Sequence, residues 1–174
     1  SVYIVVDPDS KKEAAMPNVI SDGDASTIAA WVKEGGVLVL MANDSGNNNL
    51  KSANVLSTKF GIRLNEDLYN TVQGSQFEQG AVMVPAGHPI FSSAKKIYVK
   101  EVATLTVTAP ATAVLTKEGK NIIATAKYGK GSVFVIGDPW LYNEYTDGRK
   151  LPAGFHNFQA AQDLVKWTLA QSKK

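Results

Sequence analysis

Two uninterrupted apolar runs, separated by one amphipathic segment, dominate the first part of the chain. The runs occupy residues 2–6 and 37–42. Between them Ile28, Trp31 and Val32 recur at the i, i+3, i+4 spacing of a helix. Fully apolar strands joined by a helix are typical of a parallel βαβ unit whose sheet is covered on both faces. We therefore expect a buried strand, a helix and a second buried strand. Five residues are expected to be buried between sheet and helices: Trp31, Leu38, Leu40, Val135 and Leu164.

The same pattern predicts two further helices and a third strand. A second helix is expected from about residue 47 to Phe60, and after Gly61 a strand at 62–65. A last helix is expected over about 157–170, and Asp24 is expected to cap the first one. The apolar positions of the last helix are Phe158, Ala161, Leu164, Val165 and Leu169.

From about residue 111 the pattern changes to short strands joined by turns that contain glycine. Segments 113–115, 122–126 and 133–136 are rich in strand-forming residues, and the intervening turns include Gly119 and Gly129. This alternation predicts consecutive hairpins. The whole chain, 1–174, is thus predicted to be one α/β domain, a mainly parallel sheet between helix layers with an antiparallel hairpin portion near the C-terminus.

Composition narrows the function classes. Lys and Arg number 18 against 16 Asp and Glu, and a net charge of +2 gives no reason to expect nucleic acid or an anionic membrane as a partner. The absence of Cys excludes a thiol nucleophile and a Cys-ligated zinc, and two His cannot form a multi-histidine metal site. No apolar run reaches the length of a membrane span. Because the chain opens inside an apolar run, we expect it to be excised from a longer polypeptide.

Polar residues follow the predicted strands at their carboxyl ends. Asp7 follows the first strand, Asn43, Asp44 and Ser45 follow the second, and Asp138 follows the last. Parallel strands bring their carboxyl ends to one edge of a sheet, where α/β proteins bind ligands. The sequence therefore predicts a polar rim that could hold a metal ion or a sugar. The alternative is that these side chains cap helices and turn the chain.

The loop after the last strand is the second candidate for binding. Trp140 and Tyr142 stand beside Asn143 and Glu144, and Arg149 follows. Aromatic faces stack on the C–H surfaces of sugars, carboxylates and amides bind hydroxyls, and Arg149 could pair with a uronate. This composition predicts contact with carbohydrate. The alternative is that the aromatic residues pack under the loop while its charges are solvated.

Nucleophilic chemistry has little support in the sequence. Ser45 lacks the G-x-S-x-G surroundings of a hydrolase elbow, because only one glycine, Gly46, stands near it. His88, before Pro89, could line a pocket, but no matched partner for it is evident and a turn histidine is the simpler interpretation. We assign no catalytic residue and no cofactor.

Several motifs carry a resemblance to known proteins: WVKEGGVLVL (31–40), NDSG (43–46), GHPIF (87–91), YGKGSV (128–133), DPWLYNEY (138–145) and DGR (147–149). The first four resemble the class I glutamine amidotransferase-like superfamily. The full set, which spans essentially the whole chain, resembles the domain appended C-terminally to Bacteroides-type unsaturated rhamnogalacturonyl hydrolases, glycoside hydrolases that trim pectin oligosaccharides.

The resemblance implies a flavodoxin-like three-layer sandwich in a periplasmic or extracellular protein. Because residues 43–45 replace the amidotransferase cysteine, glutaminase activity is not expected. The implied role is a non-catalytic accessory domain that supports an upstream helical-barrel hydrolase domain, mediates assembly or contacts oligosaccharide. Two alternatives stay open: a hydrolase that uses the strand-end carboxylates, with Mg²⁺ or Ca²⁺ as a possible aid, and a purely structural interaction module.

Overall fold

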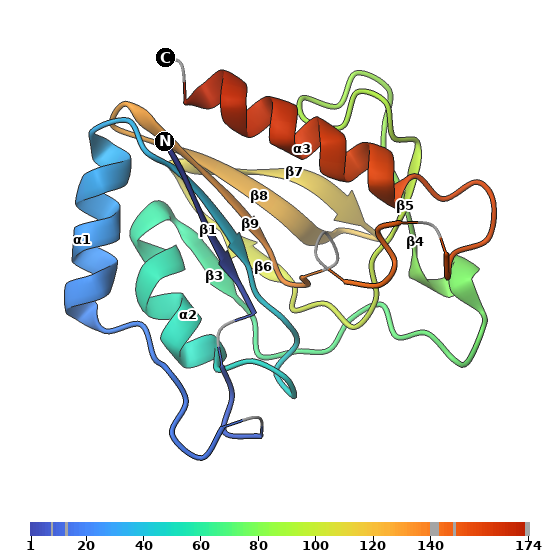
Figure 1. The fold of residues 1–174 in the computed structure, drawn as a ribbon, viewed down its shortest axis with the longest axis horizontal. Coiled ribbons are helices and arrows are strands. Elements are labelled where there is room, and N and C mark those ends of the chain that lie inside the picture. Colours follow the sequence, from blue (N-terminus) through green and yellow to red (C-terminus); the bar gives the residue numbers. More distant parts are fainter. Residues whose placement is uncertain (8, 13, 140–142, 148, 173–174) are drawn as a thin grey trace.

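The computed structural model describes residues 1–7, 9–12, 14–139, 143–147 and 149–172 (Figure 1). A seven-stranded sheet forms the middle layer, with strand order β1-β2-β9-β8-β6-β3 and β7 paired to β8. Its strands are β1 (Val2–Val6), β2 (Val37–Met41), β3 (Ile62–Leu64), β6 (Leu105–Val107), β7 (Ala111–Lys117), β8 (Lys120–Tyr128) and β9 (Gly131–Ile136). A small second sheet pairs β4 (Ala81–Met83) with β5 (Lys96–Tyr98).

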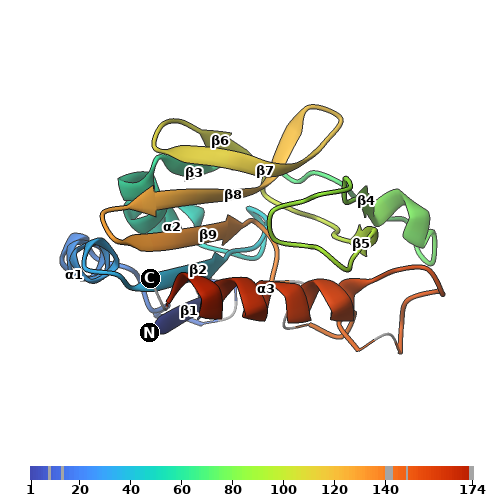
Figure 2. The same cartoon turned by 90° about the horizontal axis from the view of Figure 1, so that it is seen from above.

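Helices cover both faces of the large sheet. Helices α1 (Asp22–Lys33) and α2 (Leu50–Ser57) lie on one face, and α3 (Asn157–Gln171) lies on the other (Figure 2). Strands β1, β2 and β9 are parallel, whereas β8 is antiparallel to β9, β7 and β6, and β3 is antiparallel to β6. The predicted fold class, a three-layer α/β sandwich with a C-terminal hairpin portion, is confirmed.

The protein has a hydrophobic core on each face of the large sheet. One apolar strand contributes to both cores because its successive side chains point to opposite faces. In β2, Leu38 and Leu40 pack toward α1 and α2, whereas Val39 and Met41 pack toward α3, and all four are buried. Trp31 differs from the prediction of a core residue. It is only partly buried, since its ring lies over Gly36 and meets Tyr3 edge-on, with centroids 6.2 Å apart.

The start of α1 corrects the prediction for Asp24. The N-cap is Ser21, whose Oγ accepts a hydrogen bond from the Asp24 N–H at 3.1 Å. The Asp24 carboxylate accepts one from the Ser21 N–H at 3.0 Å, which completes a capping box. Asp24 therefore acts at the third helical position. The positive end of the helix dipole also stabilises a carboxylate at this position.

Helix α3 has the predicted position, but only some of its apolar residues face the sheet. Ala160 and Leu164 reach the core, while Phe158, Val165 and Leu169 are each about half exposed. The helix instead buries polar residues that have partners. The amide of Asn157 pairs with both backbone groups of Tyr98, at 2.8 and 2.9 Å, and Asp163 accepts from the Ser93 N–H at 2.7 Å. These polar contacts fix which side of the helix faces the sheet.

Candidate functional site

The strand ends predicted to form a polar rim do lie level with one another. The Asp7 N–H donates to the Met41 carbonyl at 2.7 Å, and the Ala42 N–H donates to the Ile136 carbonyl at 2.9 Å. Strands β1, β2 and β9 therefore end at the same edge of the sheet. We call Asp7, Asn43, Asp44 and Asp138, which follow these ends, the strand-end rim.

Asp7 is held by two amide side chains from the loop after β2. Asn43 Nδ2 lies 3.3 Å from one carboxylate oxygen of Asp7, and Asn48 Nδ2 lies 3.4 Å from the other. Asp7 itself has a φ of 45°, a left-handed conformation that short polar side chains tolerate. The Asn48 Oδ1 atom is buried without a hydrogen-bond partner. Asn48 was missed in the sequence because three consecutive Asn residues mark a loop without showing which one turns inward.

Asp44 closes its own loop. One carboxylate oxygen accepts from the Gly46 N–H at 2.7 Å and the other from the Asn47 amide at 2.6 Å. Its carbonyl accepts from the N–H groups of Asn47 and Asn48, both at 3.1 Å. The side chain is buried, whereas Ser45 beside it is exposed. These contacts are those of a turn and a cap, the alternative interpretation for this part of the rim.

Asp138 takes its partners from another part of the chain. It is buried, and its Oδ2 lies 3.2 Å from the Lys100 N–H. Burial raises the pKa of Tyr98, and the neighbouring Tyr145, Glu101 and Asp138 raise it further. The rim is therefore divided: Asp7 and Asp44 bond to the loop after β2, and Asp138 faces the segment after β5. No sequence pattern marks this second set of contacts, because Tyr98 and Lys100 lie about 40 residues before Asp138.

His88 is held by backbone groups on both sides of its ring. Nδ1 accepts from the N–H groups of Ile90 and Phe91, at 3.2 and 3.0 Å, so Nε2 carries the proton and donates to the Val114 carbonyl at 2.9 Å. The ring also stacks on Phe91, with centroids 4.9 Å apart. Burial lowers the pKa of His88 and favours the neutral form. Val114 belongs to β7, which β8 and β9 separate from β2, and the geometry is that of a turn histidine.

The predicted carbohydrate residues of the last loop bond mainly to each other. Asn143 Oδ1 accepts from the Tyr145 N–H at 3.1 Å, and Glu144 lies 3.5 Å from Lys150. Arg149 pairs with Asp147. A hydrogen bond from the backbone N–H of Glu144 lowers the pKa of that side chain, and Lys150 lowers it further. Trp140 and Tyr142 lie outside the described residues.

Among the described residues, no three His, Asp or Glu side chains come together as a group that could hold a metal ion. Of the helices that the structure describes, none combines the length and the apolar character needed to cross a bilayer.

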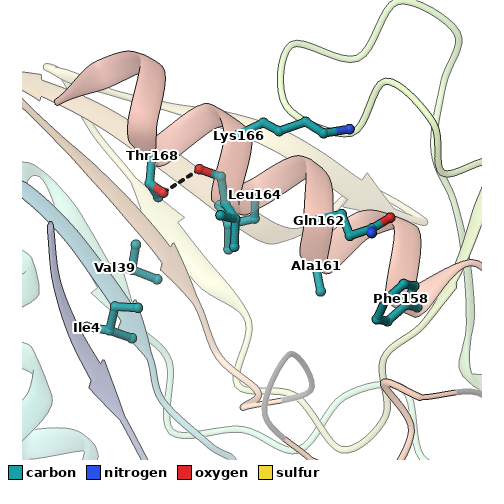
Figure 3. A pocket seen from close by; sticks show the side chains of 9 residues that line it. Ile4, Val39, Phe158, Ala161, Gln162, Leu164, Lys166 and Thr168 are labelled. Carbon is teal, nitrogen blue, oxygen red and sulfur yellow. Dashed lines mark hydrogen bonds between the residues drawn. The ribbon is translucent and has the colours of Figure 1, made fainter. Parts of the chain in front are cut away.

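An apolar groove, which the sequence did not predict, runs between β1 and α3 (Figure 3). Its volume is about 440 Å³. Ile4 and Val39 form the strand side, and Phe158, Ala161 and Val165 are among the residues of the helix side. It was missed because apolar spacing places these residues on a helix but does not show which of them the sheet leaves uncovered. We refer to it below as the β1–α3 groove.

Comparison with known proteins was informative only at the level of structure. No family model and no curated protein matches the chain. The N-terminal domain of mmIFT52 is similar over 96% of this chain and 76% of its own, with a TM-score of 0.72 and 19% identity. Cytoplasmic protein STM1381 from Salmonella typhimurium LT2 is similar over 99% and 71%, with a TM-score of 0.63 and 13% identity.

A further solved structure is much longer than this chain. The beta-galactosidase from Rahnella sp. R3 is similar over 87% of this chain but only 21% of its own, with a TM-score of 0.52 and 18% identity. At such low identities, a structural likeness shows a shared fold, and folds of this kind host unrelated functions. The chain therefore has an α/β architecture that is shared with these proteins.

Proposed function

We propose that this chain is a non-catalytic accessory domain of a glycoside hydrolase that degrades pectin, with rhamnogalacturonan as the polymer. The non-catalytic part of the proposal rests on the hydrogen bonds that the carboxylates of the strand-end rim already accept. Both oxygens of Asp44 accept hydrogen bonds from its own loop, and both oxygens of Asp7 accept from neighbouring amides. A general base or a metal ligand needs an oxygen that faces the substrate or the ion.

Other features support an accessory role. His88 has both ring nitrogens in backbone hydrogen bonds, which leaves it poorly placed to act as the base for Ser45. A fifth of a beta-galactosidase has a similar fold, so this architecture occurs as one part of a larger glycosidase. The motif resemblance supplies the pectin context, the upstream helical-barrel hydrolase domain as a partner and a periplasmic or extracellular location.

Within such an enzyme the domain would support the barrel or contact the oligosaccharide. The loop of residues 143–150 is the surface we propose for sugar contact, because Glu144, Asp147 and Arg149 bring charged groups together on it. The contact would be weak, since these groups already pair with one another and with Lys150.

Activity assays on the purified chain test the non-catalytic part. We expect no ammonia from glutamine and no cleavage of unsaturated rhamnogalacturonan disaccharides, with or without Mg²⁺ or Ca²⁺. Turnover of either substrate that is abolished in Ser45→Ala or Asp44→Asn would overturn the proposal. A glycosidase contaminant is recognised because its activity would be equal in the variants and in the unaltered chain.

Calorimetric titration with rhamnogalacturonan oligosaccharides tests the sugar contact. We expect weak heats of binding that are lost in Arg149→Ala and Trp140→Ala but retained in Lys59→Ala, which changes a charged residue on the far side of the sheet from α3. Circular dichroism establishes that each variant is folded. If millimolar oligosaccharide gives no heat, the domain serves support or assembly rather than contact with the substrate.

A further inference from the structure

Strand β1 forms one outer edge of the large sheet. The Ser1 carbonyl accepts from the Val37 N–H, and the Asp7 N–H donates to the Met41 carbonyl, so odd-numbered residues of β1 direct their backbone groups toward β2. Because these groups alternate along a strand, the N–H and C=O groups of Val2, Ile4 and Val6 point away from the sheet. Three residues thus present six backbone hydrogen-bonding groups at this edge.

The β1 edge lacks the features that protect most sheet edges. Residues 2–6 include no charged residue and no proline, and Tyr3, Ile4 and Val6 are between 40% and 49% exposed. The opposite edge, β3, is only three residues long and carries exposed Arg63 at its centre. Short strands and charged side chains prevent pairing with another chain. Of these two edges, only β1 is open to a further strand.

The apolar surface continues from β1 onto α3. Phe158, Val165 and Leu169, spaced seven and four residues apart, lie along one side of the helix and are between 51% and 53% exposed. Phe158 lines the β1–α3 groove together with Ile4 (Figure 3). Val165 lines the same groove. The edge strand and the outer stripe of the helix therefore form one continuous apolar surface.

We propose that this surface binds a second copy of the chain, with β1 paired antiparallel to β1 of the copy about a two-fold axis at Ile4. In this register Ile4 lies opposite Ile4 of the copy, and Val2 lies opposite Val6. In this register all six outward backbone groups of each β1 form hydrogen bonds with the other copy. If the register is shifted along the strand, some of the six groups have no partner in the other β1. The two sheets become one, and α3 of each copy lies on the same face of the joined sheet. This inference does not depend on the proposed function.

Area and charge favour a second copy as the occupant. Six exposed apolar residues, Tyr3, Ile4, Val6, Phe158, Val165 and Leu169, leave roughly 500 Å² accessible on one copy, with Tyr3 on the α1 side of the edge and Phe158, Val165 and Leu169 on α3. Complete burial of these residues in two copies would remove about 1,000 Å² from water, the lower limit for a specific interface. Lys166 is the charged residue that lines the groove, and its Nζ lies 3.7 Å from the carboxylate of Asp163. Two copies can therefore meet without opposing uncompensated lysines.

Sedimentation velocity between about 1 and 100 µM tests the dimer. We expect the unaltered chain to approach twice its 18.7 kDa mass as concentration rises. Ile4→Lys and Val165→Lys should raise the dimer dissociation constant at least tenfold, because each places a charge in the apolar surface. Leu68→Lys and Met83→Lys, at exposed apolar positions outside β1 and α3, are the matched controls and should leave the dissociation constant unchanged. Thermal unfolding checks that all four variants fold.

Single-cysteine variants test the register, because the chain contains no cysteine. Directly opposed residues of a hydrogen-bonded antiparallel pair have Cα atoms about 5.5 Å apart, within disulfide range. Ile4→Cys should therefore form a disulfide-linked dimer under mild oxidation at least tenfold faster than Tyr3→Cys, which would face Val5 of the copy. The proposal is overturned if the unaltered chain stays monomeric at 100 µM, if both lysine variants dimerise normally, or if Ile4→Cys has no advantage.

Discussion

The two faces of the sheet are covered by different kinds of structure. On one face, α1 and α2 come from the chain between β1 and β3, and each packs near the strands beside it in sequence. On the other face, α3 packs with β4, β5 and the loops around them, which lie far from it in sequence (Figure 2). Local apolar periodicity explains the first layer. The second layer depends on contacts between distant segments.

Buried polar side chains hold the second layer together. Asn157 reaches Tyr98 across 59 residues, and Asp163 reaches Ser93 across 70. On the α1–α2 face the comparable contact is local: the Asn54 side chain pairs with both backbone groups of Leu64, ten residues away. We therefore expect the α1–α2 face to respond most to lost apolar volume and the α3 face most to lost hydrogen bonds.

The largest expected effect is in the α1–α2 core. Leu38→Ala removes a fully buried side chain of β2 and should lower the free energy of unfolding by about 2–5 kcal/mol, since the lost transfer energy and the new cavity add. Leu68→Ala is the control, because Leu68 is half exposed and its truncation should cost under about 0.5 kcal/mol. Urea denaturation measures both. Equal effects would contradict the assignment of Leu38 to the core.

The second prediction addresses the α3 face through Asp163. Burial alone would raise the pKa of this carboxyl, but hydrogen bonds from Ser93 and the charge of Lys166 outweigh burial and hold the pKa below its ordinary value. Asp163→Ala should cost about 2–3 kcal/mol at pH 7, because charge-assisted hydrogen bonds to Ser93 are lost. Its folded pKa is depressed, so this contribution is present above pH 4 and is lost as the pH falls through the folded value.

Two controls separate the hydrogen bonds of Asp163 from its ion pair. Lys166→Ala removes only the exposed partner and should cost under about 1 kcal/mol. Asp163→Asn keeps the shape and one acceptor, so its cost should fall between the two. If Lys166→Ala lowers the free energy of unfolding as much as Asp163→Ala does, the ion pair rather than the hydrogen bonds to Ser93 stabilises α3.

The same contrast explains what the sequence could and could not predict. The fully apolar runs predicted β1 and β2 as strands, and the glycine-containing turns predicted the hairpins of β8 and β9. The expected burial of β1 was wrong, because β1 is an edge strand with Tyr3, Ile4 and Val6 exposed. The orientation of α3 could not be predicted, because spacing identifies the apolar positions of a helix but does not show that Asn157 and Asp163 have buried partners. At the rim, parallel topology correctly predicted level strand ends. The partners of Asp7 and Asp138 come from other loops, and no local pattern marks them.

The third prediction concerns the cap of α1. Ser21→Ala removes the Oγ that accepts from the Asp24 N–H and should cost about 1 kcal/mol of stability. Ser26→Ala, an exposed change within the same helix, is the matched control and should be neutral or slightly stabilising because alanine is the better helix former. Thermal and urea unfolding should agree. A neutral Ser21→Ala would show that the capping box contributes little and that tertiary packing alone sets the start of α1.

The smallest expected effect is a pH dependence from His88 on the α3 face. Burial lowers the pKa of His88, although its hydrogen bond to the Val114 carbonyl opposes the shift. Below pH 6.5 the unfolded chain therefore takes up a proton that the folded chain does not, and stability falls as the pH is lowered from 7 toward 5. His88→Asn, whose Oδ1 can accept from the N–H groups of Ile90 and Phe91, should flatten this slope, whatever its effect on stability at pH 7.

His156→Gln is the control, because it removes the other histidine of the chain and should preserve the slope. Urea unfolding at several pH values gives both slopes, and a slope that persists in His88→Asn would assign the pH dependence to other groups.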